Sequence, residues 1–166
     1  MQKELPKYLA PRDKSPENNK EYKYIPKKIF QTWASNKVSS GIYDSVSTWI
    51  DKNPDWEYHF FDDKDCRDFI KEHFLKEVLD AYDALIPGAY KADLWRYCVL
   101  YIHGGVYADI KLSLCNKLDD LLDSDSKFTS VKEREGLKTI DGGIYNVFIC
   151  SMPKHPFLKK VIDLVV

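Results

Sequence analysis

The spacing of hydrophobic residues along the chain alternates between two patterns. Short segments rich in β-branched and aromatic residues are typical of strands, and they cover 25–33, 56–61, 106–114, 128–131 and 144–150. Between them, apolar residues recur at intervals of three and four, as in helices, over 38–51, 63–82, 87–103 and 156–165. This alternation predicts an α/β fold with a central, mostly parallel sheet flanked by helices.

Residues 1–24 differ from the rest of the chain because they carry prolines among polar, mainly basic neighbours. We expect them to form an extended leader without a core of its own, followed by one domain over 25–166. A chain of 166 residues is typical of a single domain and can bury a core. Its 44% hydrophobic and 31% charged residues indicate a folded chain.

Charge and hydropathy exclude several classes of partner. The net charge of -1 argues against a nucleic-acid partner, which needs a basic face. The sequence has neither an apolar run of about 18 residues nor a signal peptide. We therefore expect a soluble, cytoplasmic protein without a transmembrane segment, which reaches a membrane only through partners. Its cysteines form no C-x-x-C pair, and we expect them to be reduced: Cys66, Cys98, Cys115 and Cys150.

Two charged residues stand out in the predicted helix that ends at His103. This helix is apolar almost all round, which indicates burial, yet it contains Asp93 and Arg96. Their i, i+3 spacing lets the two side chains touch. One interpretation is a structural ion pair inside the core. The other is a carboxylate and a guanidinium held at a cleft wall, where they can hydrogen-bond to sugar hydroxyls.

The residues after this helix favour the second interpretation. Gly104 and Gly105 predict a tight turn, and an apolar strand leads from Val106 to Asp109. An acid beyond the carboxyl end of such a strand lies where open α/β sheets bind ligands. Asp109 is thus a candidate ligand of a ribose hydroxyl or a metal ion.

The run A-D-L-W-R-Y-C-V-L-Y-I-H-G-G-V-Y-A-D, from Ala92 to Asp109, resembles the signature of glycosyltransferases with a DXD sugar-binding region. This group includes the family-32 yeast-type mannosyltransferases, related capsular-polysaccharide transferases and, more distantly, the clostridial glucosylating toxins. Further matches extend the resemblance over about residues 25–160: I-P-K-K-I-F-Q-T-W at 25–33, N-P-D-W-E-Y at 53–58, Asp62-Asp63, and H-P-F at 155–157.

The resemblance implies a GT-A-like nucleotide-sugar-binding fold and a hexosyltransferase that retains anomeric configuration. It implies a UDP- or GDP-sugar donor and a glycan or other hydroxyl acceptor. The site roles that it implies are catalysis and donor-sugar binding by Asp93 and Arg96, contact with the base by Trp33, ribose or metal contact by Asp109, and an acceptor-side position for Asn146.

The chain departs from the family pattern at Lys111, which replaces the second acid of the DXD spacing. Mn²⁺ and Mg²⁺ prefer oxygen ligands, so an ammonium group weakens a metal site at Asp109. Strand alternation places Asp109 and Lys111 on the same side, which favours a Lys111 that binds the diphosphate itself. Alternatively, Lys111 points away while Asp109 and the diphosphate hold a metal weakly.

A second departure is length, because family members continue beyond the H-P-F helix. We therefore expect a C-terminally minimal or truncated domain. Two other functions stay open: a nucleotide-sugar-binding subunit without turnover, and an unrelated α/β module in which Asp93 and Arg96 are structural.

Overall fold

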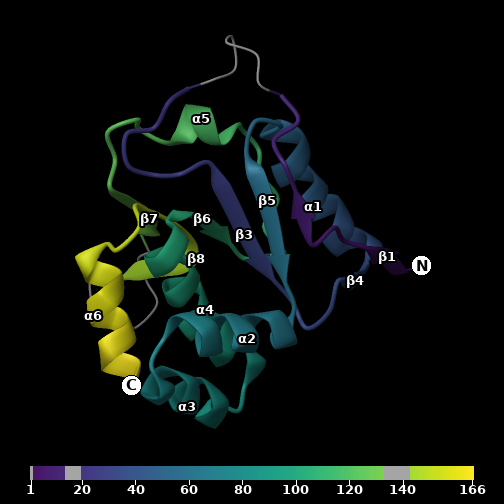
Figure 1. Ribbon diagram of the computed structural model, residues 1–166. Helices are drawn as coiled ribbons and strands as arrows, with labels where there is room; N and C mark the ends of the chain where they lie inside the picture. The colour runs from purple at the N-terminus through teal and green to yellow at the C-terminus, as the bar shows by residue number, and fades with distance from the viewer. Residues whose placement is uncertain (1, 14–19, 133–142) are drawn as a thin grey trace.

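The computed structural model describes residues 2–13, 20–132 and 143–166, which are built around a six-stranded sheet (Figure 1). The strand order is β2-β5-β3-β6-β8-β7. The strands are β2 (Tyr8–Leu9), β5 (Glu57–Phe61), β3 (Lys28–Thr32), β6 (Gly105–Ala108), β8 (Ile144–Ser151) and β7 (Phe128–Lys132). A separate two-stranded sheet pairs β1 (Gln2–Glu4) with β4 (Lys37–Ser39).

The sheet is parallel only at its centre. Strand β3 pairs in parallel with both β5 and β6, whereas β2–β5, β6–β8 and β7–β8 are antiparallel. The predicted α/β class is therefore confirmed, but the expectation of a mostly parallel sheet is corrected to a mixed one. The physical reason is that consecutive β7 and β8 form a hairpin, which needs no crossover helix.

Helices cover both faces of the sheet because successive strand residues point to opposite sides. Ile29 and Val106 pack in one core beneath α1 (Ser40–Lys52) and α5 (Leu118–Leu121). Phe30 and Tyr107 pack in the other. That second core is covered by α2 (Asp63–His73), α3 (Lys76–Ala84), α4 (Gly88–His103) and α6 (Pro156–Val165), of which α4 and α6 lie side by side (Figure 1).

The described part of the N-terminal segment runs along the domain. Strand β1 pairs with β4, and β2 extends the main sheet at β5. Leu5 is buried in the core beneath α1, and Lys7 forms ion pairs with Asp62 and Asp65 at the start of α2. Residues 2–13 therefore pair with the domain along β1 and β2 and contribute Leu5 to its hydrophobic core.

The chain reverses from α4 into β6 through Gly104 and Gly105, as the sequence predicts. Gly104 ends the helix at φ 64°, and Gly105 has φ 100°. A Cβ atom on Gly105 would lie 2.6 Å from the backbone oxygen of Lys28 on β3. Glycine is required here both by the backbone conformation and by this close approach.

Replacing Gly105 with alanine is expected to lower the free energy of unfolding by about 1–3 kcal/mol, because it combines a strained φ with overpacking. Urea denaturation followed by circular dichroism measures this change. The matched control is Gly41→Ala in α1, where a Cβ meets nothing within 4 Å and stability should be unchanged or slightly higher. Equal losses in the two variants would contradict the close-approach account.

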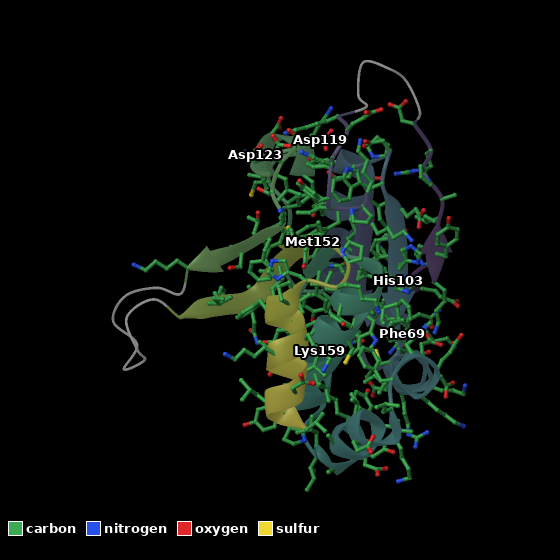
Figure 2. The ribbon with its side chains drawn as sticks, turned by 60° about the vertical axis from the view of Figure 1, so that its left-hand side comes forward. Phe69, His103, Asp119, Asp123, Met152 and Lys159 are labelled. Carbon is green, nitrogen blue, oxygen red and sulfur yellow. The ribbon has the colours of Figure 1, made fainter. Side chains whose placement is uncertain are left out.

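The β7–β8 hairpin projects from the body of the domain (Figure 2). Val131, Ile144 and Tyr145 on it are exposed, and the residues that join the two strands lie outside the described ranges.

All four cysteines are free thiols. Across residues 2–13, 20–132 and 143–166, none of the helices has the length and apolar character needed to cross a bilayer.

Candidate active site

A cavity of about 480 Å³ opens at the carboxyl ends of the three parallel strands. Its walls come from four parts of the chain: residues 32–34 at the end of β3, Asp63 at the start of α2, the first turns of α4 from Gly88 to Arg96, and Tyr107 with residues 109–111 at the end of β6. This edge is where open α/β sheets bind ligands, and the volume suits a small molecule.

Arg96 is the centre of the hydrogen-bond network at this cavity. It is only 4% exposed, and its guanidinium lies 4.5 Å from the centre of the Tyr107 ring. Its Nη2 lies 2.9 Å from Oδ1 of Asp93 and 3.3 Å from Oδ1 of Asp109. One buried cation thus joins two carboxylates that come from different elements.

The other nitrogens of Arg96 donate to the backbone. Nη1 donates to the carbonyl oxygen of Asn146 on β8 at 2.6 Å, and Nε donates to that of Ala92 at 3.3 Å. Because every nitrogen of the fork has a partner within the protein, Arg96 holds α4, β8 and the end of β6 in fixed relation.

Asp93 and Asn146 lie next to each other, beside the cavity lining. The side-chain amide of Asn146 donates to Oδ1 of Asp93 at 3.1 Å and to the Tyr97 hydroxyl at 3.4 Å. Burial raises the pKa of the Asp93 carboxyl, and Asp109 adds to the rise, while Arg96 and Asn146 oppose it. Neither residue lines the cavity itself, whereas Trp33, Arg96, Asp109 and Lys111 all do.

Asp109 is held by its neighbours on both sides. The Tyr107 hydroxyl donates to its Oδ1 at 2.8 Å, in addition to the Arg96 contact. The predicted strand over 106–114 is wrong beyond Ala108, where β6 ends, because the amide of Leu112 donates back to the carbonyl of Asp109 in a turn. Lys111 therefore reaches the cavity from this turn, and strand alternation is not the reason.

Helix α1 fixes that turn from the opposite face of the sheet. The indole nitrogen of Trp49 donates to the carbonyl of Leu112 at 2.6 Å. The amide of Leu114 donates to the Thr48 hydroxyl at 2.8 Å. These bonds hold the segment that carries Asp109 and Lys111 at the cavity.

Lys111 lies over Trp33, with its Nζ 5.1 Å from the centre of the indole ring. The residues at this point favour a weak site for a divalent cation at most, because Oδ1 of Asp109 is already bonded to Tyr107 and Arg96 and Lys111 offers no lone pair to a metal. Among the described residues, no cluster of three or more histidine, cysteine or acidic side chains could hold a metal ion.

The histidines lie away from this cavity. His59, His73 and His103 gather around the rings of Phe30 and Phe69, with centroid separations of 4.5 to 5.9 Å. Figure 2 labels His103 on α4 and Phe69 on the neighbouring α2. Burial lowers the pKa of His59 and of His103, and both rings stack on Phe30.

Two participants were not identified from the sequence. Tyr107 packs in the core, and its hydroxyl also orients Asp109. Asp63, which the sequence marks only as part of the Asp62-Asp63 match, lines the cavity. Its position two residues beyond the end of β5, at the same sheet edge as Trp33, was the available signal.

Comparisons with known proteins agree with this geometry. The family described as "Glycosyltransferase sugar-binding region containing DXD motif" matches residues 39–128, more than half of the chain. Inositol phosphoceramide mannosyltransferase 2 of Schizosaccharomyces pombe is 34% identical over 84% of this chain and 38% of its own length. The initiation-specific alpha-1,6-mannosyltransferase of Candida albicans is 33% identical, over 70% of this chain and 32% of its own length.

A solved structure, the PaToxG glycosyltransferase, aligns with 85% of this chain and 60% of its own, with a TM-score of 0.60 and 18% identity. It confirms the predicted GT-A-like α/β fold. The chain spans about a third of the length of the two yeast relatives. Because this family matches more than half of the chain, the chain belongs to the glycosyltransferase sugar-binding regions that contain a DXD motif.

Proposed function

We propose that this domain binds a nucleotide diphosphate sugar in the cavity and transfers the sugar to a hydroxyl acceptor. The observation that carries the proposal is the Asp93–Arg96–Asp109 network at the wall of a cavity that also contains Trp33 and Lys111. An aromatic platform, a cation and an ordered pair of carboxylates are the groups that a base, a diphosphate and a sugar respectively require.

In the orientation that we propose for the donor, its base lies at Trp33 and its sugar lies toward Asp93. The Trp33 indole, 37% exposed, offers a face to the base. Lys111 and the first turn of α4, which has no side-chain cap, offer positive charge to the diphosphate. The sugar then lies toward Asp93 and Asn146, which places its anomeric carbon beside the Asp93 carboxylate.

The chemistry follows from this arrangement. As the bond to the diphosphate breaks, positive charge develops on the sugar and negative charge on the leaving group. Asp93 stabilises the sugar cation, and Lys111 stabilises the departing diphosphate without help from a metal ion. We expect retention at the anomeric carbon, in which the acceptor hydroxyl enters from the side that the diphosphate leaves.

The names of the relatives indicate a hexose donor. Two of them are called mannosyltransferases, and one of these acts on inositol phosphoceramide by name. We propose mannose or a similar hexose as the transferred sugar, and the hydroxyl of a glycan or glycolipid as the acceptor.

A thermal-unfolding screen with UDP- and GDP-sugars tests this function. A donor at about 100 times its Kd is expected to raise the midpoint by roughly 5–10 °C, equally with Mn²⁺ or with EDTA. Lys111→Ala should remove most of this rise, whereas Lys111→Asp should make it depend on Mn²⁺. Lys64→Ala is the matched control, since Lys64 is an exposed lysine that pairs with Asp68.

Turnover is measured on the same samples as release of nucleotide diphosphate. A rise in the midpoint with turnover supports the transferase. A rise without turnover indicates the nucleotide-sugar-binding subunit. If no nucleotide sugar changes the midpoint, the ion-pair network is structural and the proposed function is wrong.

A further inference from the structure

Two consecutive acids at the start of α2 have different environments. Asp62 caps the helix: its side chain accepts from the amide of Asp65 and from the ammonium of Lys7. Asp63 takes no part in this capping box. Its side chain is exposed and lines the cavity, and among residues 2–13, 20–132 and 143–166 no hydrogen bond or ion pair engages its carboxylate.

Asp63 lies at the end of the cavity that holds Trp33. Strands β3 and β5 are parallel neighbours with Thr32 opposite Phe61, and the amide of Trp33 donates to the carbonyl of Phe61 at 3.3 Å. Trp33 and Asp63 therefore leave adjacent strands at the same edge. The indole provides a face for a planar ring, and the carboxylate provides acceptors at its side.

A carboxylate discriminates among the common bases because it only accepts hydrogen bonds. Guanine presents N1–H and N2–H side by side, which match the two carboxylate oxygens in a bidentate pair. Uracil presents one N–H between two carbonyl oxygens, and these repel a carboxylate. Adenine and cytosine each place a ring-nitrogen acceptor beside their amino group, with the same result.

We propose that Asp63 is the base-reading residue of this cavity and that it selects guanine. The inference rests on the proposed function, since it requires the cavity to bind a nucleotide. It assigns to Asp63 a recognition role in addition to the favourable position of any acid at a helix N-terminus. Trp33 supplies stacking that every base shares, and Asp63 supplies the choice among bases.

Isothermal titration of the domain with GDP, UDP and xanthosine diphosphate tests the proposal. The unmodified domain should bind GDP tighter than either other nucleotide by on the order of ten- to a hundred-fold. In Asp63→Asn, an amide replaces one acceptor by a donor. GDP should then weaken by a similar factor, while xanthosine diphosphate, which carries N1–H beside a carbonyl oxygen, should become the preferred ligand.

Asp68→Asn is the matched control, because it removes the same charge from the exposed side of α2, where Asp68 pairs with Lys64. It should leave all three affinities unchanged. Thermal unfolding without nucleotide verifies that both variants fold. A loss of GDP affinity relative to UDP in Asp63→Asn alone supports the base-reading role, since a helix-terminal charge effect would change the affinities of these two neutral bases equally.

Two negative results are distinguishable. If the unmodified domain binds GDP and UDP equally, or if Asp63→Asn weakens all three nucleotides by one factor, the base-reading role is wrong and the proposed function stands. If the folded domain binds none of the three nucleotides, the proposed function fails, and the inference fails with it.

Discussion

Replacing Arg96 with alanine is expected to lower the free energy of unfolding by about 3–5 kcal/mol, because the change leaves two carboxylates without their shared cation. Asp93 and Asp109 would then repel each other, and the carbonyl of Asn146 would lose its donor. Urea denaturation measures the loss. If this variant does not fold, the nucleotide affinity of Arg96→Lys provides a second test.

Lysine keeps the charge of Arg96 but cannot reproduce its planar fork, so it cannot join α4, β8 and the end of β6 together. Arg96→Lys should therefore fold with reduced stability and bind nucleotide weakly. Arg67→Ala is the control, since Arg67 makes an exposed two-bond pair with Asp83 and its loss should leave stability nearly unchanged. Unchanged nucleotide affinity in Arg96→Lys would contradict the positioning role.

Asp93→Asn is expected to reduce sugar transfer by about 10²–10³-fold while leaving nucleotide binding unchanged. The reduction follows because an amide cannot stabilise the developing sugar cation as a carboxylate does. Nucleotide binding persists because Trp33 and Lys111, which we assign to the base and the diphosphate, are unchanged. Initial rates of nucleotide diphosphate release, compared with Kd values from titration, separate the two effects.

The control for this variant is Asp80→Asn, which alters an exposed acid paired with Lys76 on α3. It should leave rate and affinity unchanged. A rate in Asp93→Asn equal to that of the unmodified domain would remove Asp93 from the chemistry and leave it as a partner of Arg96.

Much of the fold follows from local signals in the sequence. The apolar helix that stops at Gly104 and the helix that starts at Pro156 lie where capping residues and hydrophobic spacing indicate. The same holds for the aromatic strand over 57–61. One cavity is lined by four residues that the family resemblance links although they lie far apart in the chain: Trp33, Arg96, Asp109 and Lys111.

Long-range contacts account for the features that local patterns did not indicate. Strand β6 ends at Ala108 because α1 holds the next segment through Trp49 and Thr48, and no local pattern in 106–114 reveals this. The position of Asp93 beside the cavity depends on Asn146, which lies on another strand. Leu5 stands among polar residues and proline, so the adjacent sequence shows no hydrophobic pattern that indicates which core it enters.

The exposure of Trp33 has a spectroscopic consequence. The other indoles, those of Trp49, Trp56 and Trp95, are at most 3% exposed, whereas Trp33 is 37% exposed. We expect the three buried indoles to report the core and the red-shifted part of the emission to come from Trp33, which has the Lys111 ammonium above its ring. The domain therefore carries an intrinsic optical probe of its own cavity, which can be read without a label or a coupled assay.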